Sequence, residues 1–248
     1  MVNVTAAILA GGLGTRLRSV VKDRPKVLAE IGGRPFLAYL LDQLAVVKVK
    51  SIVLCTGYRG EQVQEMFGDS YAGVGLVYSR ESSPLGTAGA LRLALPLFEF
   101  DSILVMNGDS FCGMDLSAFW EWHRAHSASG TLSLVEVADT TRYGRVHVDS
   151  GGAVVRFEEK SDTGMPGCIN AGVYLLARHL LLTIPTNRPV SLERDMFPSW
   201  VGKRLYGYKC EGCFLDIGTP EAYAVAERFF AAEPSANNRV AHKMGDNQ

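Results

Sequence analysis

A glycine-rich segment near the start of the sequence has residue types suited to binding phosphate. The segment spans 9–17 and reads LAGGLGTRL, directly after an apolar run. Glycines let a phosphate approach the backbone closely, and successive amide N–H groups form an anion-binding concavity. Arg16 lies within the segment and Lys26 follows Pro25, so two cations accompany it. Because phosphoryl transfer depends on positioning and on neutralising phosphate charge, this combination predicts a nucleoside triphosphate site.

Two better-known glycine motifs do not fit this segment. A dinucleotide-binding fingerprint starting at Gly12 needs glycine or alanine at position 17, which is Leu17. A P-loop needs Gly-Lys-Ser or Gly-Lys-Thr, and neither occurs in the sequence. Without its basic partners the segment would be only moderate evidence for a phosphate-binding site, because a tight turn is the alternative explanation of its glycines.

Asp109 stands where a metal ion could be bound, and Asp216 provides a second carboxylate later in the chain. Asp109 ends the sequence Asn107-Gly108-Asp109 after an apolar run, and Asp216 precedes Thr219-Pro220. A carboxylate at the C-terminal end of a strand points into the ligand crevice of an α/β sheet. Mg²⁺ accepts one or two carboxylates together with water and phosphate oxygens. Taken alone, Gly108-Asp109 is better explained as a turn. Thr219-Pro220 is typical of a helix N-cap and first residue.

The elements that must position these residues alternate through the first half of the chain. Apolar patterns predict strands over 5–9, 51–56, 74–79 and 102–107 and helices over 36–47, 61–67 and 87–97. This order predicts an α/β fold, a Rossmann-like, mainly parallel sheet with flanking helices. The loops after its strands gather along one edge, where ligands of open α/β sheets bind.

The second half is richer in strands. We expect strands over 131–137, 145–148, 154–158, 171–176 and 204–208, and helices over 116–126, 192–200 and 220–232. We predict one domain over 1–232, with a nucleotide-binding part of about 1–115 and a strand-rich part of about 130–232. The polar residues 233–248 are predicted to be a disordered tail.

The composition excludes several classes of protein. Hydrophobic residues make up 47% and the formal net charge is −1, without a long Lys/Arg run. Nucleic-acid and membrane-surface proteins need a concentrated basic face, so no nucleic-acid or membrane partner is expected. The N-terminus lacks the basic region of a signal peptide, and five scattered cysteines favour a reduced, cytoplasmic protein. A homodimer is compatible with the sequence, which does not determine the oligomeric state.

Taken together, the motifs resemble the sugar-1-phosphate nucleotidyltransferase family. Its signature is GG-x-GTRL followed by Pro-Lys, matched here by residues 11–17 and Pro25-Lys26. The resemblance runs from about Val4 to Glu227 and implies a nucleotide-diphospho-sugar transferase (GT-A-like) fold whose strand-rich part binds the sugar. It implies attack of a sugar phosphate on the α-phosphorus of a nucleoside triphosphate, release of pyrophosphate, and Mg²⁺ as cofactor.

The resemblance also implies which residues contact the nucleotide. They are Leu9, Ala10, Gly11, Gly12, Gly14, Thr15, Arg16, Lys26, Glu81, Gly86, Thr87, Gly108 and Asp109. The PLGT sequence at 84–87 is similar to that of guanylyltransferases, which implies GTP as substrate. Glu81 could accept hydrogen bonds from guanine or could lie in solvent. Thr87 is equally suited to capping a helix.

The same resemblance implies which residues bind the sugar phosphate and the metal. Tyr143, Gly144, Glu158, Lys160 and Asn170 are implied to form the sugar-phosphate site. Asp109 and Asp216 are implied to bind Mg²⁺, and with Arg16, Lys26 and Lys160 they form the implied catalytic set. Arg145 could add positive charge beside the sugar. The Glu-Glu-Lys sequence at 158–160, taken alone, is a commonplace solvated charge run.

The identity of the sugar is less constrained. The short chain and the segment RYGRVHVD at 142–149 look most like heptose-1-phosphate guanylyltransferases. Mannose-1-phosphate guanylyltransferase is the near alternative, followed by relatives that use UTP, CTP or dTTP. A metal-dependent glycosyltransferase should carry Asp-x-Asp where this chain has Asp109-Ser110-Phe111. A non-catalytic regulatory relative should lack the Arg, Lys or Asp residues that are present here.

Other chemically active residues are predicted to have no role in catalysis. Cys210 and Cys213 form a single Cys-x-x-Cys pair without the further ligands of a zinc site, and a strand-like segment follows them. His123 and His126 lie three apart on an expected helix without acidic or cysteine partners, so they are expected to be surface or packing residues.

Overall fold

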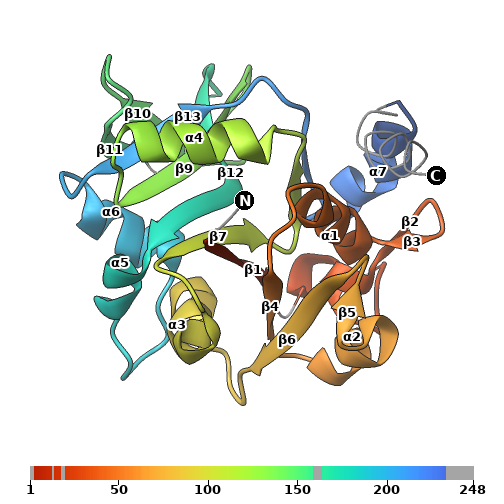
Figure 1. Cartoon of the computed structure of the whole chain (residues 1–248). Helices are drawn as coiled ribbons and strands as arrows, with labels where there is room; N and C mark the ends of the chain where they lie inside the picture. Colours follow the sequence, from red (N-terminus) through yellow and green to blue (C-terminus); the bar gives the residue numbers. More distant parts are fainter. Residues whose placement is uncertain (1–2, 13, 18–19, 159–163, 233–248) are drawn as a thin grey trace, which may run out of the picture.

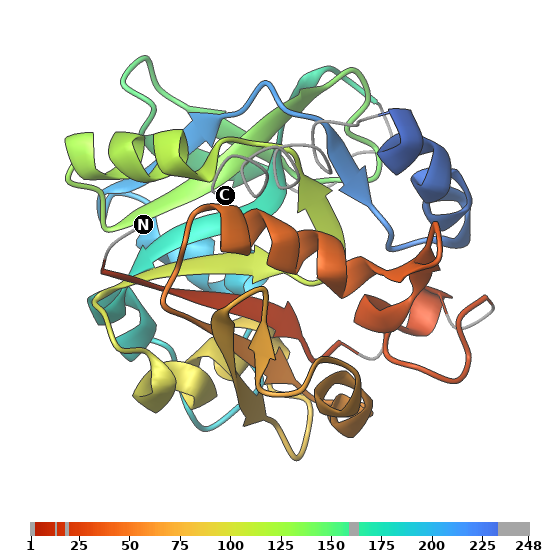
Figure 2. The ribbon, with the colours of Figure 1, turned by 45° about the vertical axis from the view of Figure 1, so that its right-hand side comes forward.

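Most of the chain builds one extended, twisted sheet with helices against it (Figures 1 and 2). The computed structural model describes residues 3–232 except 13, 18–19 and 159–163. The tail predicted over 233–248, and Lys160, lie outside the described residues. In the described part, the strand order is β11-β10-β12-β7-β1-β4-β6-β5, and β9 pairs with both β12 and β13.

The bounds of most strands in this sheet follow the sequence patterns closely, whereas β5 was not predicted. The strands are β1 (Val4–Ala10), β4 (Ser51–Thr56), β5 (Ser70–Tyr71), β6 (Val74–Arg80), β7 (Ser102–Asn107), β9 (Gly130–Val137), β10 (Arg145–Val148), β11 (Val154–Glu158), β12 (Gly167–Ala177) and β13 (Leu205–Lys209). The neighbours β7, β1, β4 and β6 run parallel, while β12 runs antiparallel to β7. The predicted α/β class, with mainly parallel strands in the first half, is confirmed.

Helices cover both faces of the sheet. The principal helices are α1 (Phe36–Val46), α2 (Gly60–Phe67), α3 (Gly86–Ala94), α4 (Leu116–Ala125), α5 (Arg178–Leu182), α6 (Phe197–Trp200) and α7 (Pro220–Ala232). Alternate residues of β1 point to opposite faces. Ile8 belongs to the core under α1, α4 and α7, whereas Ala7 belongs to the core under α3, α5 and α6. None of the described helices is long and apolar enough to cross a lipid bilayer.

The structure corrects three of the expected elements. The helix expected over 192–200 is a π-helix, Leu192–Met196, followed by the single turn of α6. The helix expected over 87–97 starts at Gly86 and ends as a 3₁₀ turn, Leu95–Leu97. The strand expected over 171–176 is longer, because β12 continues to pair with β9 back to Gly167.

Two small ladders have no counterpart in the sequence prediction. β2 (Glu30–Ile31) pairs with β3 (Arg34–Pro35), and β8 (Ser110–Cys112) pairs with β14 (Phe214–Asp216). The second ladder joins the segment that follows β7 to the segment that precedes α7, with Ser110 opposite Asp216. It therefore brings the two halves of the chain together next to Asp109.

Candidate active site

A cavity of about 490 Å³ opens at the C-terminal ends of the parallel strands. It is lined by nearly all the residues predicted to contact the nucleotide: Leu9, Ala10, Gly11, Gly12, Gly14, Arg16, Lys26, Glu81, Gly86, Thr87, Gly108 and Asp109. Thr15 begins a short 3₁₀ turn, Thr15–Leu17, between Gly14 and the cavity-lining Arg16. The structure thus brings together segments that are far apart in the sequence.

The floor of this cavity is formed where β1 and β7 end side by side. Leu9 is paired with Asn107, and the Gly108 amide donates a hydrogen bond of 3.0 Å to the Leu9 carbonyl. A side chain at Gly108 would place its Cβ only 2.5 Å from that carbonyl oxygen. Gly14 has a φ of 58°, a left-handed conformation that costs glycine little. Both glycines are therefore needed for the path of the backbone around the cavity.

Lys26 and Asp109 meet across this cavity. The Lys26 Nζ lies 2.9 Å from Asp109 Oδ2, and the two side chains are 11% and 44% exposed. Lys26 begins a 3₁₀ turn whose next two residues, Val27 and Leu28, are buried and anchor it to the core. A confined ammonium beside a more accessible carboxylate leaves the carboxylate able to accept a metal ion. The ammonium is then free to face phosphate oxygens.

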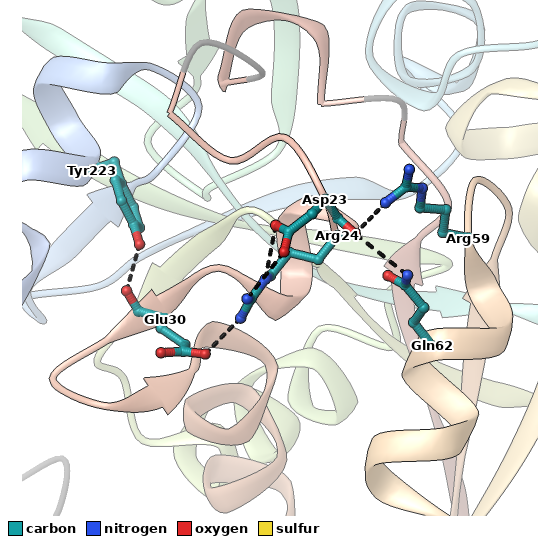
Figure 3. Close-up of polar contacts among 6 residues, drawn as sticks. All are labelled: Asp23, Arg24, Glu30, Arg59, Gln62 and Tyr223. Carbon is teal, nitrogen blue, oxygen red and sulfur yellow. Dashed lines mark hydrogen bonds and ion pairs between the residues drawn. The ribbon is translucent and has the colours of Figure 1, made fainter.

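The loop that leads into Lys26 is held from two directions (Figure 3). The Asp23 carbonyl accepts a hydrogen bond from Arg59, the residue before α2. The Arg24 guanidinium lies 2.5 Å from Glu30, whose carbonyl accepts a hydrogen bond of 2.5 Å from Tyr223 of α7. Exposed ion pairs contribute little to stability. Their effect here is to define the approach of the chain to Lys26.

Glu81 lies against the glycine loop. A Cβ added to Gly11 would lie 2.9 Å from Glu81 Oε1, while Glu81 Oε2 accepts a hydrogen bond of 3.0 Å from the Leu85 amide. Partial burial raises the pKa of the Glu81 carboxyl above its usual value. The carboxylate is therefore a partly desolvated acceptor in the cavity wall.

Thr87 does not cap a helix, contrary to the alternative raised by the sequence. α3 begins one residue earlier, at Gly86, so Thr87 lies inside it. The Thr87 hydroxyl donates to Glu193 at 2.9 Å and accepts from the Leu192 amide at 2.8 Å. It ties the PLGT loop to the π-helix.

A second cavity, of about 710 Å³, adjoins the first on the strand-rich side. Its lining includes the described residues predicted for the sugar phosphate: Tyr143, Gly144, Glu158 and Asn170. Within the described part of the chain, Arg16, Asn107, Asp109 and Glu193 line both cavities. Molecules bound in the two cavities would therefore meet beside Asp109.

The wall of the second cavity contains charges that neutralise one another. Glu158 pairs with Arg145 through one carboxylate oxygen, and its other oxygen lies 2.7 Å from His147 Nε2. The hydrogen bond from Arg145, followed by that from His147, lowers the pKa of Glu158. Arg145 therefore does not supply the unpaired positive charge that the sequence suggested. It holds Glu158 ionised and oriented.

Asn170 is positioned by a buried tyrosine. The Tyr174 hydroxyl accepts hydrogen bonds from Asn170 Nδ2 at 2.9 Å and from Asn107 Nδ2 at 3.1 Å, and Tyr174 is fully buried. Asn170 Oδ1 accepts a further bond from the Gly172 amide. This network links the floor of the nucleotide cavity to the sugar-side cavity.

The two aspartates predicted to bind metal lie close to each other at one end of the β8–β14 ladder, Asp216 within it and Asp109 just before β8. Asp216 is paired with Ser110, the residue after Asp109, and the Ile217 amide donates to the Asp109 carbonyl at 3.0 Å. Both aspartates line the second cavity. The described residues contain no group of three or more His, Cys, Asp or Glu arranged for a metal ion. Two carboxylates suit Mg²⁺ shared with phosphate, because this ion keeps waters and substrate oxygens in its shell.

Sequence reasoning missed Glu193, Arg142 and Arg194 as cavity residues. Glu193 and Arg194 lie in the segment SLERD, where acidic and basic residues alternate as on a solvated helix. Their exposure to the cavity depends on the π-helix and on its contact with Thr87. Arg142 had a weak signal, since it directly precedes Tyr143 and Gly144.

One of the histidines predicted to be a surface or packing residue is clearly buried. His123 is 5% exposed, and its Nδ1 lies 2.7 Å from the Thr131 hydroxyl. Burial lowers its pKa to about 4. His126 stacks on Trp122, with ring centroids 3.8 Å apart. Of the two alternatives raised by the sequence, surface or packing, His123 therefore fits the packing one.

Residues 5–233 match the model of the family described as nucleotidyl transferase. The chain belongs to this family. It is 37% identical over 224 residues to mannose-1-phosphate guanylyltransferase of Mycobacterium tuberculosis, covering 89% of this chain and 62% of that relative's length. It is 35% identical to D-glycero-alpha-D-manno-heptose 1-phosphate guanylyltransferase of Aneurinibacillus thermoaerophilus, covering 90% of this chain and 96% of that one.

Solved structures of similar proteins agree with the family membership. The crystal structure of HddC from Yersinia pseudotuberculosis is 33% identical, with a TM-score of 0.81 over 91% of this chain and 99% of that one. A second structure of HddC, complexed with GMP-PN, has a TM-score of 0.77. The resemblance to nucleotidyltransferases, stated from the motifs, is therefore confirmed.

Proposed function

We propose that this protein transfers a guanylyl group from GTP to a sugar 1-phosphate, giving a GDP-sugar and pyrophosphate. The observation that carries the proposal is the junction of two cavities at Arg16, Asn107, Asp109 and Glu193. One cavity has a glycine-rich, phosphate-compatible wall and the other a wall of polar side chains. A bond between two bound molecules would form where these cavities meet.

The reaction follows from this arrangement. The sugar phosphate oxygen attacks the α-phosphorus in line, and pyrophosphate leaves on the opposite side. Arg16 and the amides of the glycine loop hold the β- and γ-phosphates, while Lys26 neutralises charge that grows on the α-phosphoryl group. No general base is needed, because the attacking phosphate is already ionised at neutral pH.

Asp109 and Asp216 are the residues that would hold Mg²⁺, which supplies further charge neutralisation to the triphosphate. Lys160, implied by the resemblance, would orient the attacking phosphate. Asp109 has a second task, because its ion pair with Lys26 keeps the ammonium directed at the reacting phosphates.

Guanine is the proposed base. Glu81 offers a desolvated carboxylate beside Gly11, suited to accept from guanine N1–H and N2–H₂. The relatives named guanylyltransferase and the GMP-PN complex of HddC support the same choice. Adenine presents neither of these two donors in that arrangement, so Glu81 would discriminate against ATP.

D-glycero-D-manno-heptose 1-phosphate is the proposed sugar substrate, with mannose 1-phosphate as the second candidate. The segment RYGRVHVD at 142–149 is similar to that of heptose-1-phosphate guanylyltransferases, which favours heptose. The two sugars differ by one carbinol unit. A cavity discriminates such a unit only by hydrogen bonding to its hydroxyl or by excluding it.

The test is pyrophosphate release with Mg²⁺, in which GTP, UTP, CTP, dTTP and ATP are each paired with heptose 1-phosphate and with mannose 1-phosphate. We expect release only when GTP and one of these sugar phosphates are both present, and faster release with heptose 1-phosphate. Failure of every pair, in folded protein that binds GTP by calorimetry, would overturn the catalytic proposal. That result would favour a regulatory nucleotide-sugar-binding protein.

A further inference from the structure

Three cysteines from distant parts of the sequence gather behind the candidate metal site. Cys112 ends β8, and Cys210 and Cys213 lie in the connection between β13 and β14. The Sγ atoms of Cys112 and Cys210 are 3.3 Å apart. The Gly113 amide donates to the Cys213 carbonyl at 2.8 Å, which holds this connection against the end of β8.

In the contact between Cys112 and Cys210, one thiol is the hydrogen-bond donor and the other the acceptor. The Cys210 amide and thiol both lie against the Leu134 carbonyl, at 2.8 Å and 3.1 Å. With the Cys210 thiol proton directed at Leu134, the Cys112 thiol is the donor between the two sulfurs. Donation from Cys112 lowers the pKa of Cys210 and raises that of Cys112. Cys112 is 1% exposed and Cys210 is half-buried, so an oxidant reaches Cys210 first.

The same two segments carry the aspartates proposed to bind Mg²⁺. Cys112, at the end of β8, follows Asp109 by three residues, and Cys213, just before β14, precedes Asp216 by three residues. Cys112 is itself paired with Phe214 in the β8–β14 ladder. Any movement of the Cys112 backbone relative to the 210–213 connection is therefore transmitted to the ladder.

We propose that Cys112 and Cys210 form a peroxide-oxidisable pair whose disulfide slows catalysis by displacing the β8–β14 ladder. The Cys210 thiolate attacks one oxygen of hydrogen peroxide, forming a sulfenic acid and releasing hydroxide, which takes a proton to become water. The Cys112 sulfur then displaces the sulfenic hydroxyl, and the thiol proton leaves with it as a second water. The two sulfurs lose two electrons, the peroxide gains them, and a dithiol such as dithiothreitol reverses the change.

The expected cost to catalysis comes from geometry. A disulfide bond requires the sulfurs to close from 3.3 Å to about 2.0 Å, a movement of roughly 1 Å. Displacements of this size in a catalytic constellation can cost about a hundredfold in rate. Because we expect other parts of the β8–β14 ladder to adjust to this movement, we expect turnover to fall about tenfold rather than a hundredfold. This effect on rate rests on the function proposed above, whereas formation of the cross-link does not.

The test uses the full-length protein, reduced and then exposed to hydrogen peroxide. Free thiols are alkylated, and the protein is digested without reduction for peptide mapping by mass spectrometry. A Cys112–Cys210 cross-link should form together with a roughly tenfold fall in turnover, and dithiothreitol should restore both. Cys210→Ser should lack the cross-link and keep its turnover in peroxide, whereas Cys213→Ser should behave as wild type. Cys112→Ala provides a second variant lacking the pair if Cys210→Ser is unstable.

The outcomes are separable. Recovery of Cys112 and Cys210 as alkylated free thiols, after treatment that oxidises Cys168 or Cys213, would overturn the pair. A mapped cross-link in enzyme that turns over as fast as the reduced form would overturn the coupling to the ladder. Reduced protein that makes no GDP-sugar would defeat the proposed function instead, while the peptide map would still decide whether the pair exists.

Discussion

The two cavities are built in different ways. The nucleotide side is formed by backbone at the ends of parallel strands, where Gly108 packs onto the Leu9 carbonyl and a few charged groups point inward. The sugar side is formed by side chains on antiparallel strands, where Glu158 is held by Arg145 and His147. A cavity wall made of backbone changes only when its loop adopts another conformation. A cavity wall made of side chains changes with single substitutions. We infer that binding of the triphosphate depends on the first wall and sugar choice on the second.

The largest effect should come from Lys26, which belongs to the nucleotide side. Lys26→Ala should lower kcat about 10³-fold, because it removes a confined cation from the reacting phosphates. Steady-state pyrophosphate release measures this, with thermal unfolding as a check on the fold. Lys50→Ala is the matched control, since Lys50 is 68% exposed and pairs with Glu99 on the surface. A kcat of Lys26→Ala within tenfold of wild type would remove Lys26 from the mechanism.

On the sugar side, Glu158→Gln should raise KM for the sugar phosphate about 30-fold, because a hydrogen bond to a charged group is worth about 2 kcal/mol. KM for GTP should stay within twofold. Arg156→Ala provides the comparison, since this exposed residue lies 3.5 Å from the same carboxylate and should change KM less than threefold. Equal changes in the two KM values would contradict the division of labour between the walls.

Substitution of Glu81 tests whether the nucleotide cavity also recognises the base. Glu81→Gln should reduce the preference for GTP over ATP about tenfold, since one charged hydrogen bond is lost. Burial raises the pKa of Glu81, so its acceptor form is lost as the pH falls from neutral through that raised pKa. KM for GTP should therefore rise in mildly acidic solution for the wild type and stay flatter for Glu81→Gln. Parallel pH profiles would show that Glu81 does not contact the base.

The smallest kinetic effect is expected at His123, which lies on the buried face of α4 and lines neither cavity. Burial lowers its pKa to about 4, so between this value and 6.5 the unfolded chain binds a proton that the native protein does not bind. Stability is then complete above the unfolded pKa of 6.5 and decreases as the pH falls. Denaturant titrations should show a loss of about 2 kcal/mol between about pH 7.5 and pH 5 from this group.

His123→Asn should lack that loss, and its kcat near neutral pH should be unchanged. His126→Asn, which alters the neighbouring histidine bonded to the Trp122 carbonyl, should keep the pH dependence of the wild type. A pH-dependent stability of His123→Asn equal to that of the wild type would assign the effect to other groups.

The sequence was most informative where structure is local. The strands 51–56 and 102–107 and the helix 220–232 have the predicted bounds, because apolar runs between turn residues specify them without reference to the rest of the chain. The same holds for the glycine loop, because most of its described residues line the nucleotide cavity.

The remainder required contacts between distant segments. β8 and β14 are three residues each, too short for any periodic pattern, and exist because they pair with each other. Glu193 reached the cavity because Thr87 and Ser191 hold its carboxylate, and no local signal distinguishes it from a solvated helix residue. Arg145 looked like free positive charge because its partner, Glu158, lies on the next strand.

The β8–β14 ladder sets the order in which function can arise during synthesis. The glycine loop, Lys26 and Asp109 all emerge from the ribosome in the first half of the chain, but Asp216 follows much later. A chain that ends before β14 therefore lacks one of the two aspartates that we propose to bind Mg²⁺. Such a chain should not complete the transfer, whatever nucleotide it binds.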